Sequence, residues 1–488
     1  MTKTCLVLLI STLCFAGVTP RTTSVKLILG AQSTDQTLVL RNLTLIDGNG
    51  GAPRKGVTLV ISGGVITEMN ADSSTQIPEG ATVRNLTGHY VIPGLIDSHV
   101  HLTSPSTERV RSQLHEALLG GLTAVRDMGG DAIQLGELAG RSPNPQIESP
   151  RIYYSAIIAG PSWFSDPRAA ASAHGFKPGT IPWLRAVSDD TDIEKVVAEA
   201  RAAGATGLKI YANLPPNLVS KLTAEGHRWS MMVWSHATIY PSRPSDAVAA
   251  GVDVISHSVY LYWEIAGHVP DSYQEGRNEL PGAIERSAHG VESLRPLLTQ
   301  MKNKGTILDA TLFVTMMLAQ PTPSGRPDPR PQFAYAATRL ARELGVTVCA
   351  GTDAMLSDAS PAQAAGSAGS QSSVSASSPS GSSKSGVQGS QQQAAKGQQP
   401  ATTAAPVLPN LHRELELLVE KSGFTPLEAI TAATRNSARA IGIDRAYGTV
   451  EVGKGADLVV LTADPSVDIR NTRKIAFVVK GGMIYRRR

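Results

Sequence analysis

Short apolar runs alternate with amphipathic stretches along most of this 488-residue chain. Amphipathic spacing typical of helices occurs at Glu108–Leu119, Asp192–Ala203, Asn217–Glu225 and Tyr335–Leu344. Eight apolar runs lie around and between such stretches: Val91–Asp97, Leu122–Met128, Ile152–Ile158, Gly207–Ala212, Met231–His236, Asp253–His257, Thr306–Leu312 and Val346–Gly351. Strands separated by helices pair in parallel. The pattern therefore predicts an α/β protein whose residues 91–445 form a (β/α)₈ TIM barrel.

The two flanks of this region show a different pattern. Residues 37–90 and 446–488 contain short alternating strands bounded by turn residues. The expected strands are Thr37–Arg41, Val57–Ile61, Val65–Met69, Gly448–Val452, Asp457–Leu461 and Ile475–Ile484, the last with a hairpin turn at Gly481-Gly482. Each flank is too small to hold a core of its own. We therefore expect the two ends of the chain to form one β-sandwich beside the barrel.

Two segments do not fit into a packed domain. Residues 1–17 combine Lys3, an apolar run and small residues, which predicts a secretory signal peptide. Residues 357–405 hold 14 Ser and 8 Gln in 49 positions and no aromatic residue, so they cannot bury enough apolar surface to offset their ordering entropy. We expect this insertion to be a disordered loop that tolerates deletion, and we expect a periplasmic or secreted protein.

Charge and cysteine content narrow the function classes. The formal net charge is +4, and the basic residues form no stripe with interleaved aromatics, so we expect no nucleic-acid partner. No segment approaches the roughly 20 apolar residues of a membrane span, so we expect no membrane partner. Cys5 and Cys14 lie in the predicted signal peptide, so the mature chain would hold only Cys349 and could form no internal disulfide.

Polar side chains that can bind metal stand at the ends of five of the eight runs. They are His99, His101, Lys209, His236, His257 and Asp353. Each has an ordinary alternative: a lone histidine at a strand end is often structural, a buried lysine can form an ion pair, and an aspartate can cap a helix. However, His99 and His101 lie on one face of a strand, and all barrel strands end at one mouth. The combination therefore predicts a metal site.

These residues carry a resemblance to a known family. The chain resembles the metal-dependent amidohydrolase superfamily, and within it the imidazolonepropionase-like and prolidase-like group. The resemblance runs from about residue 37 to 488, without the Ser/Gln-rich insertion. Its motifs are Val91-Ile92-Pro93-Gly94-Leu95-Ile96-Asp97-Ser98-His99-Val100-His101, the lysine of the fourth run, the two later histidines, Gly351-Thr352-Asp353, and Val125-Arg126-Asp127-Met128-Gly129-Gly130.

The resemblance implies two divalent metal ions, and it implies their ligands. His99, His101 and Asp353 would hold one ion, His236 and His257 the second, and Lys209, carboxylated on its amine, would bridge them. Zinc suits this ligand set, and Mn²⁺, Co²⁺ or Fe²⁺ also fit. Asp353 would take a proton from the metal-activated water and pass it to the leaving nitrogen. Tyr211 would donate to the developing oxyanion, or would simply be a packed barrel tyrosine.

Substrate selection is expected in two long connections that are rich in aromatic residues. Residues 159–190 carry Trp163, Phe164, His174 and Trp183, and residues 259–300 carry Tyr260, Tyr262, Trp263, His268 and Tyr273. Such side chains either line a pocket or cover helices.

The resulting hypothesis is a secreted binuclear hydrolase. It would cleave an amide C–N bond in a small peptide, such as an Xaa-Pro peptide, or in an N-acyl amino acid. Hydrolysis of a cyclic amide or imidazolone, or of an ester or lactone, is the alternative activity, and a non-catalytic binding barrel is the alternative class. The sequence predicts a small-molecule substrate and leaves open whether the protein forms a homo-oligomer.

Overall fold

The computed structural model describes residues 36–356 and 407–487, apart from residues 103, 105, 145, 288, 289 and 322–324. The predicted signal peptide and the Ser/Gln-rich insertion therefore lie outside the described residues. Both therefore remain predictions from the sequence.

Eight parallel strands form a closed barrel, and this confirms the predicted fold. The strands are β6 (Leu95–Val100), β7 (Leu122–Asp127), β8 (Arg151–Ala159), β11 (Gly207–Ile210), β12 (Met232–His236), β13 (Val254–Ser256), β14 (Ile307–Asp309) and β15 (Val348–Cys349). Each pairs in parallel with the next in chain order. The amides of Ser98 and Asp353 close the ring by donating to the carbonyls of Ala350 (3.0 Å) and His99 (2.7 Å).

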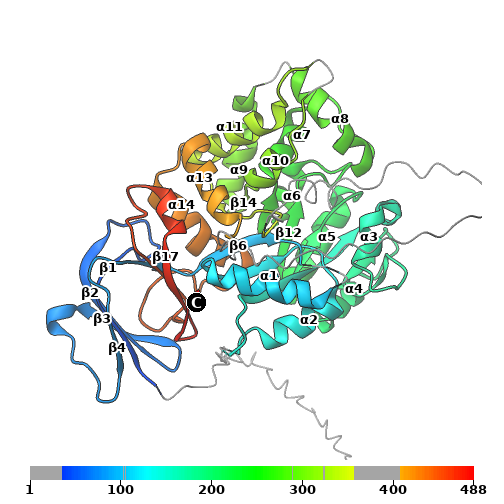
Figure 1. The fold of residues 1–488 in the computed structure, drawn as a ribbon. Helices are drawn as coiled ribbons and strands as arrows, with labels where there is room; N and C mark the ends of the chain where they lie inside the picture. The colour runs from blue at the N-terminus through cyan, green and yellow to red at the C-terminus, as the bar shows by residue number, and fades with distance from the viewer. Residues whose placement is uncertain are drawn as a thin grey trace, which may run out of the picture. The chain divides into compact units, whose positions relative to one another are not determined.

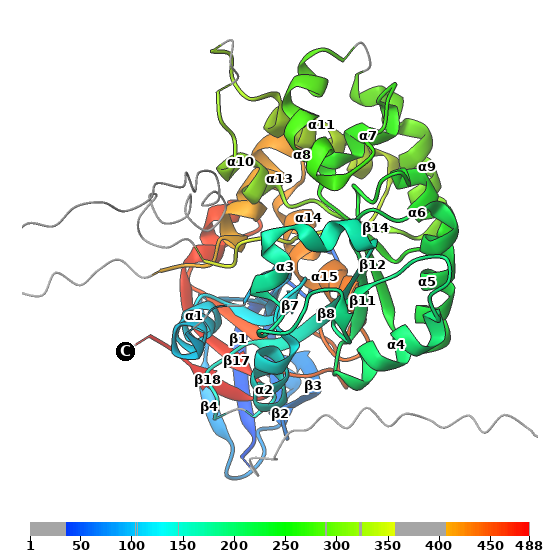
Figure 2. The same ribbon diagram turned by 90° about the vertical axis from the view of Figure 1, so that its right-hand side faces the viewer.

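The helices lie outside the strands, as Figure 2 shows for α4, α5 and α6 beside β11 and β12. Their bounds are α1 Thr107–Leu119, α2 Ala132–Arg141, α3 Pro167–Ala171, α4 Ile193–Ala202, α5 Pro216–Arg228, α6 Pro244–Ala250, α7 Tyr262–Ile265, α8 Tyr273–Glu285, α9 Arg295–Lys304, α10 Leu312–Met317, α11 Pro329–Leu344, α13 Leu411–Ser422, α14 Pro426–Thr431 and α15 Ser437–Ile441. Within the described part of the chain, none of them is long and apolar enough to cross a membrane.

Helix α4 illustrates why these segments become helices. The Asp192 side chain caps its first turn by accepting from the amide of Lys195 at 3.0 Å. Val196, Val197 and Ala200 recur on one face and are buried. That face packs against the barrel, where it covers β11.

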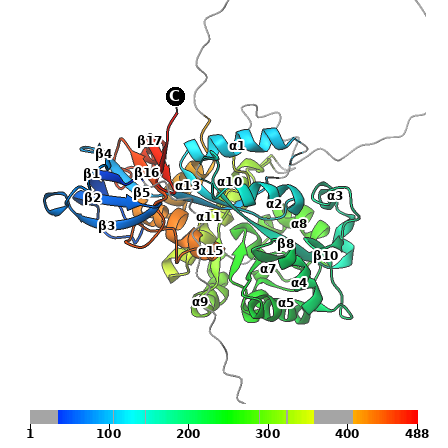
Figure 3. The same ribbon diagram turned by 90° about the horizontal axis from the view of Figure 1, so that it is seen from below.

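Strands from both ends of the chain form a second sheet of eight strands. They are β1 (Leu38–Leu45), β2 (Arg54–Ser62), β3 (Val65–Ala71), β4 (Thr82–Asn85), β5 (Tyr90–Pro93), β16 (Leu458–Leu461), β17 (Ile475–Lys480) and β18 (Met483–Tyr485). The order is β18-β17-β16-β5-β1-β2-β3, with β4 also paired to β1. Figures 1 and 3 show the blue N-terminal and red C-terminal strands side by side. The expected union of the two ends is confirmed, and it takes the form of one continuous sheet.

Strands β5 and β16 belong to two apolar cores at once. Val91 and Val460 point into the core of the second sheet, whereas their neighbours Ile92 and Val459 point into the barrel core. Alternate side chains of a strand face opposite sides, so one short strand can serve both cores. The second sheet is thereby attached to the barrel at the N-terminal side of β6, the strand that carries His99.

The first predicted barrel strand, Val91–Asp97, is divided in the structure. Its first part lies in β5 of the second sheet, and the barrel strand β6 begins only at Leu95. The break falls at Gly94, where an added Cβ would lie 2.1 Å from the Thr123 hydroxyl oxygen. The chain changes sheets at a point where only glycine fits, and a continuous apolar run conceals that change.

Other predicted strands are shorter than expected or absent. The run Thr306–Leu312 gives only β14, because Thr311 adopts a left-handed backbone (φ 50°) and Leu312 begins α10. Residues 448–452, predicted as a strand, instead form a bend followed by irregular backbone and a turn, and Val452 is exposed. The segment makes single loop contacts, such as the bond from the Val450 amide to the Asp47 carbonyl (2.9 Å), and it has no partner strand among the described residues.

Candidate metal centre

Six polar side chains converge at the C-terminal ends of the barrel strands. His99 lies in β6, Lys209 in β11 and His236 at the end of β12, and His257 and Asp353 follow β13 and β15. The sixth, His101, directly follows β6. The structure thus brings together all six residues that the sequence predicts as metal ligands. Their position agrees with that of active sites in barrels of this kind.

The tightest group of potential ligands consists of His99, His257 and Asp353. One ligand atom from each lies within 4.8 Å of those of the other two. The Asp353 carboxylate is 3.3 Å from Nε2 of His99 and 2.9 Å from Nε2 of His101. His99 is fully buried, whereas the His101 side chain is 44% exposed at the mouth. Imidazole and carboxylate donors at these separations suit a divalent transition metal.

Lys209 lies at the floor of this group. Its side chain is buried, and Nζ is 3.5 Å from Nε2 of His99. Burial lowers the pKa of the Lys209 amine to about 8, because the charged form loses its hydration. A substantial fraction of the amine is therefore neutral near pH 8, which is the form that reacts with carbon dioxide.

The buried histidines are held with one nitrogen directed toward the centre. Nδ1 of His257 bonds the Thr311 hydroxyl at 2.8 Å, and Nδ1 of His236 bonds the Thr238 hydroxyl at 2.5 Å. The two rings are 4.5 Å apart between centroids. Burial lowers the pKa of His257 to about 3 and holds that of His236 well below its ordinary value. The Thr238 backbone amide also donates to Nδ1 of His236, at 3.2 Å. Both rings are therefore neutral at pH 7, and the neutral imidazole is the form that can bind a metal.

Asp353 and His257 both adopt a strained backbone. Their φ angles are 58° and 75°, in the left-handed region that non-glycine residues rarely occupy. Strain of this kind is found at functional sites, where the surrounding structure holds it in place. Burial alone would raise the pKa of the Asp353 carboxyl, but His99 and His101 outweigh it and hold that pKa well below its usual range. Asp353 is therefore a carboxylate at neutral pH.

A buried aspartate that the sequence analysis did not single out fixes the orientation of His99. Oδ2 of Asp309, at the end of β14, lies 2.7 Å from Nδ1 of His99. Asp309 also accepts from the Ser256 hydroxyl (2.9 Å) and approaches the Arg126 guanidinium (3.4 Å). A carboxylate behind a metal-binding histidine sets its tautomer and increases its basicity. The rule that selected the candidate ligands, a polar residue ending a strand, also applies to Asp309.

Tyr211 forms part of an aromatic wall beside the histidines. Its ring lies 4.9 Å from Lys209 Nζ and 5.0 Å from the ring of His236. Trp163 contacts the Tyr211 ring (4.8 Å), and Tyr260 contacts that of His236 (5.2 Å). Burial holds the pKa of the Tyr211 hydroxyl well above its usual value, so this group is a hydrogen-bond donor at neutral pH.

The two aromatic connections divide between pocket and cover. Trp163, Tyr260 and Tyr273 face the centre. By contrast, Trp183 donates to the Ser172 carbonyl (2.8 Å) and Tyr262 to the Ala283 carbonyl (2.8 Å), which fixes them within the covering layer. Both expected roles are therefore present.

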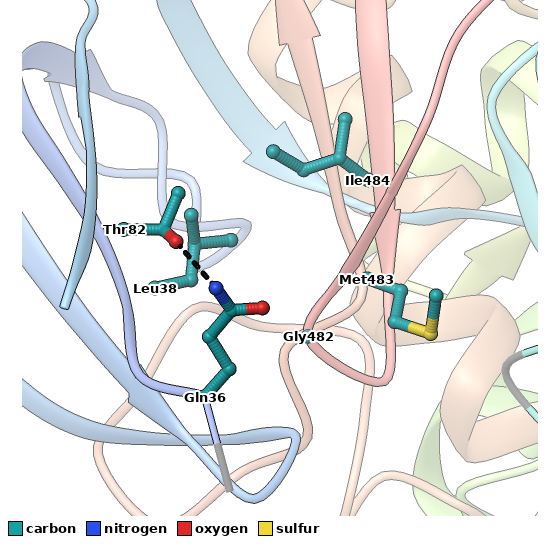
Figure 4. A pocket seen from close by; sticks show the side chains of 6 residues that line it. All are labelled: Gln36, Leu38, Thr82, Gly482, Met483 and Ile484. Carbon is teal, nitrogen blue, oxygen red and sulfur yellow. Dashed lines mark hydrogen bonds between the residues drawn. The ribbon is translucent and has the colours of Figure 1, made fainter. Parts of the chain in front are cut away.

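A small hollow also lies at the end of the second sheet (Figure 4), with a volume of about 200 Å³. It is lined by Gln36, Leu38, Thr82, Gly482, Met483 and Ile484. The Gln36 amide donates across it to the Thr82 hydroxyl at 2.9 Å. Its lining contains no ionisable side chain, so it lacks the acid, base or metal ligands that the barrel mouth provides.

Comparison with known families supports the assignment of the barrel mouth as the functional site. A sequence profile of the amidohydrolase family matches residues 90–485. This span contains every residue of the candidate centre.

Individual relatives match over shorter stretches or at lower identity. Imidazolonepropionase of Thermoplasma volcanium is 42% identical over 60 residues, which cover 12% of this chain and only 15% of that enzyme. A Xaa-Pro dipeptidase solved with methionine in its active site superposes with a TM-score of 0.63 at 19% identity, covering 92% of this chain and all of that one. Ochratoxinase of A. niger gives 0.63 and 19%, covering 92% and 96%. The structural matches therefore establish the fold alone.

Proposed function

Because the chain belongs to the amidohydrolase family, we propose that it is a binuclear metal-dependent hydrolase of amide C–N bonds. The observation that carries the proposal is the buried amine of Lys209 beside His99, within a group of imidazoles and one carboxylate. A buried lysine surrounded by neutral histidines has no evident structural use, whereas a carbamate formed on it is an additional oxygen ligand.

The residues present fit two divalent ions, and we propose zinc. His99, His101 and Asp353 would hold one ion, His236 and His257 the other, and carboxylated Lys209 would bridge them. When bound, such ions polarise a substrate carbonyl and lower the pKa of water toward neutrality. Asp309, Thr311 and Thr238 keep the imidazoles oriented for this task.

Two side chains act directly in the proposed reaction. Asp353 is ionised at neutral pH, so it can accept the proton of the attacking water and deliver it to the leaving nitrogen. The protonated Tyr211 hydroxyl donates a hydrogen bond to the substrate, which would stabilise negative charge that develops on the carbonyl oxygen.

The proposed substrates are N-acyl amino acids and small peptides, including Xaa-Pro peptides. The test is a screen of both compound classes with the full chain reconstituted with zinc and bicarbonate. Release of free amino acid that stops on chelation and returns with zinc is expected. A metal-loaded protein that hydrolyses no member of either class would overturn this substrate assignment.

The second candidate activity is hydrolysis of a cyclic amide, and the match to imidazolonepropionase motivates it. The same screen should therefore include a hydantoin, a dihydropyrimidine, an imidazolone and a lactone. Ring opening without release of amino acids from linear substrates would favour this candidate. Binding of metal with no hydrolysis of any compound would instead favour a non-catalytic barrel.

We further propose that the protein is exported. The proposal rests on residues 1–17, where Lys3 precedes an apolar run and small residues. Fractionation of expressing cells should place the protein outside the cytoplasm, with a mature N-terminus beyond the apolar run. An intact N-terminus on cytoplasmic protein would contradict it.

A further inference from the structure

Three polar groups from separate segments meet beside the candidate metal centre. They are the guanidinium of Arg168 in α3, the hydroxyl of Tyr211 just after β11, and the hydroxyl of Tyr273 at the start of α8. Nη1 of Arg168 is 3.4 Å from each hydroxyl oxygen, and the two hydroxyl oxygens are 3.3 Å apart. None of the metal-ligand assignments or the motifs accounts for this meeting of the three groups.

The cluster lies on the wall of the proposed active site. The rings of Tyr211 and Tyr273 are 5.0 and 5.6 Å from that of His236 between centroids. Both tyrosines are buried, with 8% and 4% of their surface exposed, whereas the Arg168 side chain is 45% exposed. A substrate can therefore reach the guanidinium, whose Nη1 lies against the two buried hydroxyls.

The three groups have more donors than acceptors. Their mutual distances of 3.3–3.4 Å exceed the usual lengths of such hydrogen bonds. The Tyr211 hydroxyl donates to that of Tyr273, so the proton of the Tyr273 hydroxyl is left without an acceptor among the residues that the structure describes. Neutral oxygens at long distance do not satisfy these donors, whereas an anionic oxygen would form shorter and stronger bonds.

Asp166 orients the guanidinium for this purpose. Its carboxylate accepts from Nε and Nη2 of Arg168 at 2.9 and 2.6 Å. Those bonds occupy one edge of the fork and leave Nη1 directed at the phenols. The guanidinium also lies over the Tyr273 ring, 5.2 Å from its centroid, which restricts its movement further.

We propose that Arg168 and Tyr273 bind a carboxylate of the substrate, so that the preferred substrates carry a free carboxylate close to the scissile bond. This inference rests on the proposed function, because it concerns the substrate of that site. Arginine is the usual partner of carboxylates, and a phenol adds a second donor. Tyr211 lies between this subsite and Lys209; its hydroxyl donates to that of Tyr273 in this structure and would turn to the reacting carbonyl when substrate binds.

The first test measures binding without turnover, by calorimetry on the zinc-loaded full chain. The probes are L-proline, L-leucine and L-phenylalanine, each paired with its amino alcohol, which lacks the carboxylate and has no amide to cleave. At least one amino acid should bind about 10-fold or more tighter than its alcohol, as expected for charged hydrogen bonds. Arg168→Gln and Tyr273→Phe should remove that difference and leave binding of the alcohol unchanged.

Arg185→Gln is the matched control, because Arg185 lies in the same connection and pairs with Glu199 away from the cluster. It should retain the preference for the carboxylate. The proposal is overturned if no amino acid binds more tightly than its alcohol, or if Arg168→Gln weakens both members of a pair equally.

Kinetics separate this proposal from the proposed function. With N-acetyl amino acids, Arg168→Gln should raise KM about 10-fold or more with little change in kcat, and with the corresponding carboxamides it should change neither. Hydrolysis of acids and carboxamides alike, unaffected by the substitution, would leave the function standing and remove the subsite. Selective binding of amino acids that depends on Arg168, without hydrolysis of any linear amide, would keep the subsite and overturn the proposed function.

Discussion

At the residue scale, the account depends on the environment of Lys209. The amine is buried beside the imidazole of His99, and no carboxylate within hydrogen-bonding distance neutralises it among the described residues. If it carries the bridging carbamate, Lys209→Ala should lose the second metal and nearly all turnover, and a short carboxylic acid should restore part of both. Metal content and hydrolysis are the measurements. Full activity with both metals retained would show that the lysine is structural.

The lowered pKa of Lys209 gives a pH dependence with a definite sign. Its amine is protonated below about pH 8 and neutral above it, and only the neutral form takes up carbon dioxide. In metal-free protein at fixed dissolved carbon dioxide, bound isotope-labelled carbamate should therefore increase from about pH 7 to about pH 9. The signal is read by NMR, with Lys209→Ala as the control. A signal that is flat over this range, or equal in the control, would contradict the assignment.

Asp309 supports a further prediction. It bonds Nδ1 of His99 at 2.7 Å, and it is not one of the proposed metal ligands. Asp309→Asn keeps the size of the side chain and removes the charge that fixes the tautomer. Metal affinity should fall roughly 10- to 100-fold. Asp457→Asn, which disturbs the ion pair with Arg151 where the second sheet meets the barrel, is the control for general destabilisation. Equal losses in both variants would remove the specific role.

The sequence predicts the candidate ligands but not the contacts that support them. His99, His101, Lys209, His236, His257 and Asp353 are visible as polar residues that end or interrupt apolar runs, a one-dimensional signal. The contact between Asp309 and His99 joins residues 210 positions apart, so it appears only once the barrel closes. The meeting of Arg168 with Tyr273 depends on two irregular connections, whose course no periodicity describes.

At the element scale, Gly94 controls where the chain leaves the second sheet and enters the barrel. Gly94→Ala would place a Cβ 2.1 Å from Oγ1 of Thr123, so a side chain or the backbone must move. The free energy of unfolding should fall by about 1–3 kcal/mol. Gly51→Ala, whose Cβ meets nothing within 4 Å, is the matched control and should have little effect.

Denaturant unfolding of both glycine variants measures the difference, and Thr123→Ala in the Gly94→Ala background should recover part of it. Equal free energies of unfolding for Gly94→Ala and the parent would show that the junction accommodates the added methyl group and would contradict this prediction.

Element types were predictable wherever a regular period extends over several residues. The expected helices at Glu108–Leu119 and Asp192–Ala203 agree with α1 and α4 to within one residue at each end. The run Val91–Asp97 was misassigned because both sheets bury apolar residues, so the pattern alone shows no boundary. Residues 448–452 alternate in polarity without a partner strand, and pairing cannot be inferred from one segment.

At the scale of the whole molecule, the candidate centre depends on the closed barrel. Its proposed ligands come from the ends of β6, β11, β12, β13 and β15, and closure between β15 and β6 brings Asp353 to His99. The second sheet shares β5 and β16 with the barrel core and so supports the start of β6. The metals and the complete barrel are therefore expected to stabilise each other.

Elemental analysis of the full chain, purified with zinc and bicarbonate, tests the central claim most directly. Five proposed ligands arranged around a carboxylated Lys209 predict a stoichiometry that approaches two metal ions per chain, falling to about one in Lys209→Ala. A metal content well below one ion per chain, in protein that still hydrolyses its substrate, would contradict the binuclear site.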